Sequence, residues 1–276
     1  MSARTHVVDP RIATTFLFVP GDRPERFGRA ASAGAEVVII DLEDGVNPSA
    51  RPAARDNVAS WLRSGEAAVV RLNARGTRDH TLDLEALRGV ATHVMLSKTE
   101  SAAEAESTAG DLGLGVQVVA LLETAQGIAR ASAIAASDVV IRLALGNVDL
   151  ATELGVDADD QQALLTARSL LAIASAAAGL AGPVDGVTTN LDDTERVTAD
   201  ASHASSLGFR GKLCVHPRQI GAARLGLAPS AAQISWAERI LATASGGEAR
   251  AVDGTMVDRP VEDRARDILR RATTGA

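Results

Sequence analysis

The stretch VVALLET at residues 118–124 is an apolar run that ends on a carboxylate, Glu123. A run of this length between Gly115 and Gly127 is typical of a β-strand that is buried on both faces. Other apolar runs in the chain also end in a charged residue, at positions 37–41, 68–71 and 93–98. Because helix-like stretches separate these runs, the pattern predicts a parallel α/β fold, a (β/α)8 TIM barrel, with its chemistry at the C-terminal ends of the strands.

The length of the chain fits one such barrel with an appendage, since its 276 residues exceed the roughly 250 of a typical (β/α)8 barrel. We expect a catalytic barrel domain at residues 1–228 and a C-terminal extension at residues 229–276. Gly246 and Gly247 precede a predicted hairpin at 251–258, so the extension is a candidate lid that contacts a neighbouring subunit. The other expected strands cover residues 14–19, 36–43, 67–73, 92–96, 139–145, 184–189 and 212–215.

Composition narrows the class of protein. Hydrophobic residues make up 46% and charged residues 23%, as in a soluble globular protein with a large core. The net charge of -7 predicts no general attraction to nucleic acid or to anionic membranes. The single cysteine, Cys214, excludes an internal disulfide, and the first twenty residues lack the order of a signal peptide. We therefore expect a cytoplasmic protein that acts on a small molecule.

Two carboxylates follow adjacent expected strands. Glu123 closes the run at 118–124, and Asp149 comes just after the run at 139–145. Neighbouring parallel strands end at the same edge of a barrel, so these side chains are near enough to share one cation. The five histidines lie far apart and offer no zinc-like spacing, whereas carboxylate oxygens suit Mg2+ or Mn2+. We predict a metal site formed by Glu123 and Asp149.

Further charged residues stand where other strands end. Asp41, Glu43 and Asp44 form an acidic cluster that requires a cation or an arginine nearby. Arg71 lies near the end of a buried run, so it must face a carboxylate, a ligand or solvent, and a structural ion pair is the alternative to a functional role. Lys98 is either a Schiff-base nucleophile or an ion-pair partner, and the nearby acidic strand ends favour the ion pair.

Arginines also follow the first expected strand. Arg23, Arg26 and Arg29 are suited to holding a phosphate-bearing ligand, although a solvated helix start explains them equally well. His216 follows the last expected strand and is either an acid or base or a packing histidine.

Motifs along nearly the whole chain, in order, resemble the citrate lyase beta-subunit-like branch of the HpcH/HpaI aldolase family. They are FVPGDRPERF at 18–27, DLED at 41–44, RLN at 71–73, LET at 122–124, GNVDL at 146–150, DGV at 185–187, GFRGKLCVHP at 208–217 and DGTMVDRP at 253–260. The sequence departs from the family pattern at Ser97, where a proline is common, at Asn147 and Val148 in the loop before Asp149, and at Asn190.

The resemblance implies a TIM-barrel homotrimer that binds Mg2+ and makes or breaks a carbon–carbon bond in a 3-hydroxyacyl thioester. By resemblance, Glu123 and Asp149 match the metal ligands, Arg71 matches a substrate-binding arginine, and Asp258 matches an aspartate that the lid of an adjacent subunit supplies. Arg23 and Arg29 fall where coenzyme A contacts are expected. We count Glu43, Asp44 and Lys98 among the substrate-binding residues as well.

These features predict a Mg2+-dependent lyase that cleaves a 3-hydroxyacyl-CoA of the citramalyl-CoA or malyl-CoA type. Arg71 would stabilise the enolate that forms on the thioester fragment, and Asp258 would exchange a proton with it. The alternatives are a metal-dependent pyruvate aldolase that acts on free hydroxy-oxoacids, a malyl-CoA thioesterase, and the beta subunit of a citrate lyase complex. A lysine-based aldolase acting through Lys98 is the remaining alternative.

Overall fold

The structure, a computed structural model, describes residues 9–242, 250–252 and 255–274. The chain forms two compact units, Met1–Gly226 and Leu227–Ala276. Their boundary lies two residues before the division expected from the sequence. The role of the second unit as a lid stays a prediction, and the proposed hinge at Gly246 and Gly247 lies outside the described residues.

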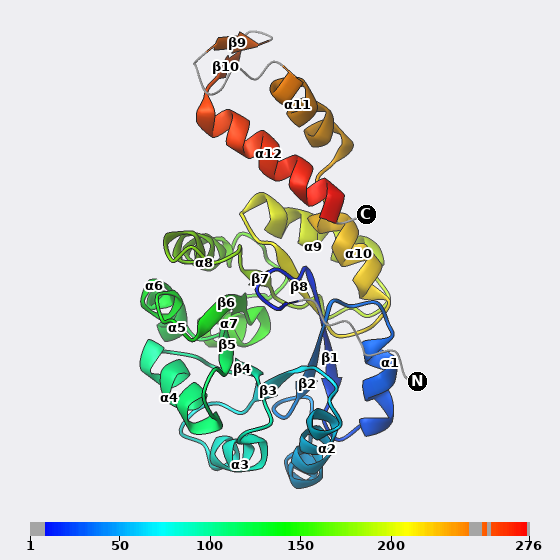
Figure 1. The fold of residues 1–276 in the computed structure, drawn as a ribbon, viewed down its shortest axis with the longest axis vertical. Coiled ribbons are helices and arrows are strands. Elements are labelled where there is room, and N and C mark those ends of the chain that lie inside the picture. Colours follow the sequence, from blue (N-terminus) through cyan, green and yellow to red (C-terminus); the bar gives the residue numbers. More distant parts are fainter. Residues whose placement is uncertain (1–8, 243–249, 253–254, 275–276) are drawn as a thin grey trace. The chain divides into compact units, whose positions relative to one another are not determined.

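The first unit is a closed barrel of eight parallel strands, paired in sequence order from β1 to β8 and back to β1. Figure 1 shows this ring of strands with helices around it, which confirms the predicted (β/α)8 fold. The strands are β1 (Thr15–Pro20), β2 (Val37–Asp41), β3 (Val69–Leu72), β4 (His93–Leu96), β5 (Gln117–Leu122), β6 (Val140–Leu145), β7 (Val184–Asp185) and β8 (Gly211–Cys214).

Strands β2 and β7 end earlier than the sequence pattern predicts. Strand β2 stops at Asp41 because the carboxylate of Asp41 accepts the backbone N–H groups of Glu43 (2.9 Å) and Gly45 (2.8 Å), which turns the chain. Strand β7 stops at Asp185 because the amide side chain of Asn147 binds both backbone groups of Val187, at 2.8 and 3.1 Å. In each case a polar side chain takes hydrogen bonds that a longer strand would have used.

Four helices of the first unit begin after an N-cap residue whose side chain binds the first turn. Thr77, Ser101, Thr124 and Asp193 each accept a hydrogen bond from a backbone N–H in the first turn of the helix that follows. The helices are α1 (Phe27–Ala31), α2 (Arg51–Arg63), α3 (Arg78–Leu87), α4 (Ala102–Leu112), α5 (Ala125–Ala129), α6 (Ala131–Ala135), α7 (Asn147–Leu154), α8 (Leu165–Ala177), α9 (Thr194–Ser206) and α10 (Gln219–Leu227), with short 3-10 turns at η1 (Pro24–Arg26) and η2 (Pro48–Ala50).

Alternating strand residues form two separate cores. One core includes helix residues such as Ala54 and Val58 together with Ile40 and Val118, so it fills the space between the barrel and its helices. The other core holds the intervening strand residues, which face the barrel interior; among them are Phe16, Ile39, Val69, Met95, Val119 and Leu121. Asp41, Arg71 and Glu123 follow Ile39, Val69 and Leu121 by two residues, so they continue the interior row at the C-terminal mouth of the barrel.

The second unit is a helical hairpin with a small sheet: α11 (Ala231–Ala242), the antiparallel pair β9 (Arg250–Val252) and β10 (Thr255–Val257), and α12 (Arg259–Thr274). It has its own apolar core of Ala237, Ile240, Val257, Ala265 and Ile268. The strand pair agrees with the hairpin expected there, and α12 begins four residues before the helix predicted at 263–272.

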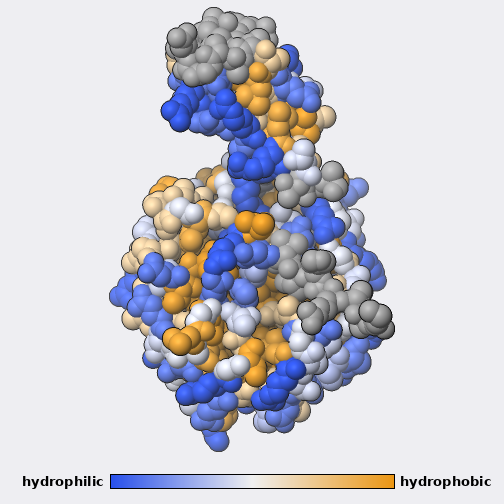
Figure 2. Space-filling view, viewed as in Figure 1, coloured by the Kyte–Doolittle hydropathy of each residue, from blue (hydrophilic) through white to orange (hydrophobic). Residues whose placement is uncertain are grey.

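The surface of the barrel unit is mixed in character. Figure 2 shows hydrophobic residues interspersed with hydrophilic ones on the face in view. Exposed apolar side chains of the described residues include Leu170 and Ile173 on α8. None of the helices in the described part of the chain has the length and apolar character needed to span a membrane.

Candidate active site

Glu123 stands at the mouth of the barrel, directly after β5, and only 2% of the residue is exposed. Its Oε1 accepts the backbone N–H of Lys98 at 2.9 Å. A Cβ at position 146 would lie 2.3 Å from Glu123 Oε2, so Gly146 allows the end of β6 to pass this carboxylate closely. Burial, and then the nearby carboxylate of Glu43, raise the pKa of Glu123 to about 8. A cation at this position would favour the ionised form.

Asp149 lies in the first turn of α7, which follows β6 directly. The start of α7 is fixed by the buried side chain of Asn147, which binds the backbone of Val187 beyond β7. Gly186 leaves room for this amide, because a Cβ there would lie 2.0 Å from Asn147 Oδ1. Asn147 thus couples the first turn of α7, which carries Asp149, to the segment that follows β7.

Lys98 brings the two predicted metal ligands together. Its Nζ lies 3.7 Å from Glu123 Oε1 and 3.2 Å from Asp149 Oδ1, and it donates to Glu43 Oε1 at 3.0 Å. Although burial by itself lowers the pKa of Lys98, the charges of Glu123, Glu43 and Asp149 raise it above its ordinary value. Lys98 is therefore held as an ammonium ion, which agrees with the ion-pair interpretation and disfavours a Schiff-base nucleophile.

Arg71 is engaged by two carboxylates. Its Nε and Nη2 donate to the two oxygens of Asp41 at 2.7 and 2.6 Å, and its Nη1 lies 3.0 Å from Glu43 Oε2. The guanidinium also lies over the ring of Phe18, 4.9 Å from its centroid. Burial opposes the charge, but Asp41 raises the pKa of Arg71 above its ordinary value. A guanidinium has five N–H groups, so donors remain for a ligand.

The cluster carries more negative than positive charge. Asp41, Glu43, Glu123 and Asp149 supply four carboxylates, and Arg71 and Lys98 supply two cations, so full ionisation gives 4 − 2, a net of −2. One divalent cation would balance this excess, and the donors are the oxygens that Mg2+ prefers. Within the described residues, no group of three or more His, Cys, Asp or Glu side chains is arranged to hold a metal. Glu123 and Asp149, which both approach the Lys98 ammonium, would supply two oxygen ligands to such an ion, and Mg2+ usually keeps water or substrate oxygens in its other positions.

Other residues predicted for the site make no ion pair or hydrogen bond with this cluster in the described part of the chain. Arg23 and Arg29 are exposed near the start of α1, and the nearest acidic contact of Arg23 is Asp22 at 3.8 Å. Asp44 is exposed as well. His216 Nδ1 accepts the backbone N–H of Arg218 at 3.2 Å, which is the bond expected of a structural histidine. Their predicted contacts with a ligand stay predictions.

Asp258 belongs to the second unit, where it precedes α12. Its Oδ1 accepts the backbone N–H of Val261 at 3.4 Å, and its carbonyl oxygen accepts that of Glu262 at 3.0 Å. Asp258 is thus the N-cap of a 16-residue helix. Its predicted role in catalysis stays a prediction.

Asp41 and Ser97 belong to the cluster but were not chosen as site residues from the sequence. Asp41 was recognised only as part of an acidic group, and its pairing with Arg71 follows from the register of β2 against β3. Ser97, where the family pattern has proline, donates its hydroxyl to Glu43 Oε2 at 3.0 Å. The sequence does not specify the register of β2 against β3, so it could not show that Asp41 pairs with Arg71. The serine at residue 97, in place of the usual proline, could have indicated that Ser97 belongs to the site.

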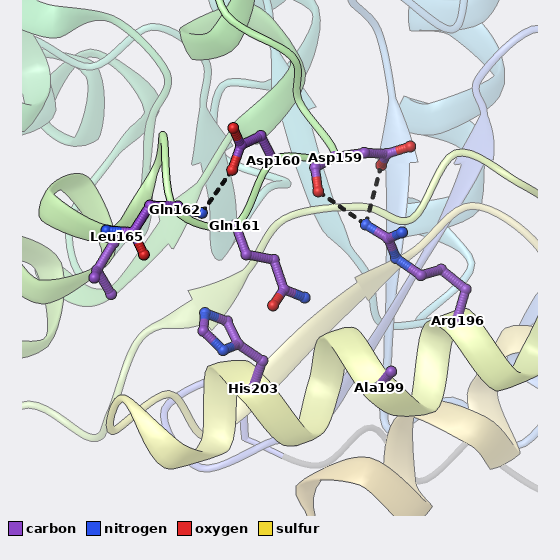
Figure 3. Close-up of a pocket in the computed structure, with 8 residues that line it drawn as sticks. All are labelled: Asp159, Asp160, Gln161, Gln162, Leu165, Arg196, Ala199 and His203. Carbon is purple, nitrogen blue, oxygen red and sulfur yellow. Dashed lines mark hydrogen bonds and ion pairs between the residues drawn. The ribbon is translucent and has the colours of Figure 1, made fainter.

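A separate pocket of about 520 Å³ lies between the segment before α8 and helix α9. In Figure 3 the Arg196 guanidinium points toward Asp159, while Asp160 binds the backbone of Gln162. The pocket shares none of its lining residues with the carboxylate cluster: they are Asp159, Asp160, Gln161, Gln162, Leu165, Arg196, Ala199 and His203. Arg196 pairs with Asp159, and Asp160 accepts backbone N–H groups, so we do not assign this pocket to the reaction.

Comparison with known proteins identifies the family of the chain. The model of the HpcH/HpaI aldolase/citrate lyase family matches residues 14–217. A citrate lyase subunit beta-like protein of Mycobacterium tuberculosis is 42% identical over 265 residues, which cover 93% of this chain and 94% of that protein. A (3S)-malyl-CoA thioesterase of Cereibacter sphaeroides is 30% identical over 262 residues, covering 93% and 92% of the two chains.

The solved structures include a similar barrel. The crystal structure of CitE from Mycobacterium tuberculosis in complex with magnesium, acetoacetate and coenzyme A has a TM-score of 0.85 and 39% identity, and the match covers 95% of this chain and 99% of that one. The fold, the carboxylates at the barrel mouth and the extended sequence similarity lead to one conclusion: this chain belongs to the HpcH/HpaI aldolase/citrate lyase family.

Proposed function

We propose that the protein is a Mg2+-dependent carbon–carbon lyase that cleaves a 3-hydroxyacyl-CoA of the malyl-CoA or citramalyl-CoA type to an acyl-CoA and a 2-oxoacid. The observation that carries the proposal is the approach of Glu123 and Asp149 to one point, next to Arg71, at the mouth of the barrel. The family and the magnesium- and coenzyme-A-bound CitE structure support the choice of cofactor and substrate class.

Glu123 and Asp149 would hold Mg2+, with Mn2+ as a substitute, because they are the carboxylates of the cluster that Arg71 does not pair with directly. Bound there, the ion would polarise the hydroxyl and carboxylate oxygens of the substrate. Glu123 itself is buried, which strengthens its interactions with nearby charges.

Arg71 and Asp258 would act on the enolate that forms when the carbon–carbon bond breaks. Cleavage leaves an enolate on the thioester fragment, and the N–H donors of Arg71 that its two carboxylates do not use would stabilise that oxygen. Asp41 and Glu43 fix the plane of the guanidinium before substrate arrives, so little reorganisation is required. Asp258, supplied by the second unit of a neighbouring subunit in a homotrimer, would deliver the proton to the enolate carbon.

The coenzyme A moiety would be bound outside the barrel mouth. Arg23 follows β1 and Arg29 lies on α1; both are exposed, and their cationic side chains suit the phosphates of a coenzyme. Glu43, Asp44 and Lys98 complete the set of side chains that we assign to substrate binding.

A second function has specific support. The (3S)-malyl-CoA thioesterase of Cereibacter sphaeroides is similar over nearly the whole chain, so hydrolysis of the thioester is the first alternative. It differs from cleavage in its products, because a thioesterase releases malate and free coenzyme A, whereas a lyase releases a 2-oxoacid and acyl-CoA. A pyruvate aldolase or a citrate lyase beta subunit would require a free hydroxy-oxoacid or a carrier-bound thioester instead.

The metal assignment has a direct test. Glu123→Gln and Asp149→Asn preserve side-chain shape and remove one charge each. Both variants should lose Mg2+ binding in isothermal titration calorimetry while they keep the wild-type circular dichroism spectrum. Retention of the wild-type Mg2+ dissociation constant by both variants would refute the assignment.

A further inference from the structure

Lys98 has an unusual backbone. It is the only non-glycine residue in the described ranges with a positive φ, at 49°. The left-handed region is unfavourable for a residue with a Cβ and is retained where the surroundings enforce it. Here the conformation directs the backbone N–H of Lys98 to Glu123 Oε1 at 2.9 Å, while the side chain of the same residue also reaches the carboxylate cluster.

The ammonium of Lys98 is shared by three carboxylates from three parts of the barrel. Glu43 follows β2, Asp149 lies on α7 and Glu123 follows β5. Their nearest carboxylate oxygens lie 3.0, 3.2 and 3.7 Å, respectively, from Lys98 Nζ. The side chain is 34% exposed, so it can move toward solvent. The group thus has the position and the charge of a cation bound between the two proposed metal ligands.

We propose that Lys98 is an internal counter-ion that competes with the divalent metal. In the metal-free protein its ammonium lies beside both Glu123 and Asp149, in the place that the charge of the metal would take. When Mg2+ binds, the ammonium leaves Glu123 and Asp149 and stays with Glu43, because two cations cannot share the same pair of oxygens without strong repulsion. This inference rests on the proposed function, since it takes Glu123 and Asp149 as the metal ligands.

The inference gives Lys98 a role opposite to that of a simple positioning residue. A competing cation lowers the affinity for Mg2+, so removal of its charge should tighten binding. A lysine that only orients Glu123 would have the reverse effect, since its removal would loosen the ligand. The backbone N–H that binds Glu123 is present with any side chain at residue 98, so a substitution tests the ammonium alone.

Calorimetric titration of Mg2+ into the wild-type protein, Lys98→Met and Lys98→Arg separates these roles. Methionine keeps the length of the side chain without the charge, and arginine keeps the charge. We expect the Mg2+ dissociation constant of Lys98→Met to fall by a factor on the order of ten, and that of Lys98→Arg to stay near the wild-type value. Equal or weaker binding by Lys98→Met, with wild-type binding intact, would overturn the inference and leave the metal assignment standing. Absence of Mg2+ binding by the wild-type protein would overturn both.

A second measurement needs no substitution. The chain contains two lysines, Lys98 and Lys212, so protein labelled with 15N and 13C only in lysine gives two side-chain NMR signals. Lys212 is buried against Asp185 at 3.0 Å and serves as an internal control. Saturating Mg2+ should shift the Lys98 signal and accelerate exchange of its ammonium protons with water, while Lys212 stays unchanged. An unchanged Lys98 signal and exchange rate in Mg2+-saturated protein would contradict the displacement.

Discussion

The guanidinium of Arg71 and the carboxylate of Asp41 form a bidentate ion pair between adjacent strands, at 2.7 and 2.6 Å. The two residues are partners in the register of β2 and β3, and both are largely buried. The pair fixes the orientation of the cation that we assign to the enolate. This buried pairing distinguishes Arg71 from Arg23 and Arg29, which are exposed.

Replacement of Arg71 by lysine should keep the positive charge and lose the bidentate geometry. We expect kcat for thioester cleavage to fall by about 10²–10³, the usual effect of losing one preorganised donor to a developing oxyanion. The Mg2+ dissociation constant should change little, because Glu123 and Asp149 remain. Steady-state kinetics and calorimetry on the same preparation check both points, and wild-type kcat in Arg71→Lys would remove the residue from the mechanism.

Asp258 offers a matched pair of substitutions. Asparagine is as good an N-cap as aspartate, so Asp258→Asn should preserve the start of α12, whereas Asp258→Ala should also weaken the helix. Both variants should lose turnover while they still bind substrate, but only Asp258→Ala should lower the melting temperature. Turnover at the wild-type rate in Asp258→Asn would exclude the carboxylate as the proton donor.

The same variant tests whether the second unit acts across subunits. The Asp258→Asn and Glu123→Gln proteins are each expected to be inactive, and mixing their subunits should restore part of the activity. In some mixed oligomers an intact Glu123 from one variant meets an intact Asp258 from the other. Light scattering establishes the oligomeric state, and mass spectrometry of differently labelled subunits establishes exchange. Absence of recovered activity after proven exchange would indicate that Asp258 serves its own chain.

The C-terminal ends of the strands could be predicted from the sequence, and their mutual register could not. Glu123, Arg71 and Lys98 close apolar runs, and parallel strands must end together at one mouth of the barrel, so their proximity followed from the fold class. The pairing of Asp41 with Arg71 depends on how β2 aligns with β3, which a period of two residues does not specify. The pattern of apolar runs therefore predicted where the charged residues lie but not which of them pair with one another.

Local side-chain bonds explain the errors in element length. The helix expected from residue 159 begins at Leu165, because Asp157 and Asp160 bind backbone N–H groups of the preceding loop and hold it out of the helix. Asn147 shortens β7 in a similar way through the backbone of Val187. Such bonds join residues up to 40 positions apart in the sequence, where no pattern within one element reveals them.

Cys214 gives a pH-dependent prediction that is independent of the site. Burial raises the pKa of its thiol from 9.0 to about 11. Between these values the unfolded chain loses a proton that the folded chain keeps, so the free energy of unfolding should fall by about 2–3 kcal/mol as the pH rises through this window. Because the chain has no tyrosine, thiolate absorbance near 240 nm can be followed directly.

Cys214→Ala isolates this effect from the titration of other groups. The difference in unfolding free energy between the wild-type protein and the variant should change between pH 8 and pH 11, and the wild-type thiolate signal should appear with a midpoint well above 9.0. A thiolate midpoint at the ordinary value would show that the thiol is not shielded from water.

The most direct test of the central claim is incubation of the purified protein with Mg2+ and malyl-CoA, citramalyl-CoA or 3-hydroxy-3-methylglutaryl-CoA, followed by mass spectrometry of the products. Parallel reactions contain EDTA, the Glu123→Gln variant or free hydroxy-oxoacids. The account predicts that at least one of the thioesters gives an acyl-CoA and a 2-oxoacid or acetoacetate in equal amounts, only with metal and only with intact Glu123. Release of malate with free coenzyme A would identify a thioesterase instead, and cleavage confined to the free hydroxy-oxoacids would contradict the proposed lyase.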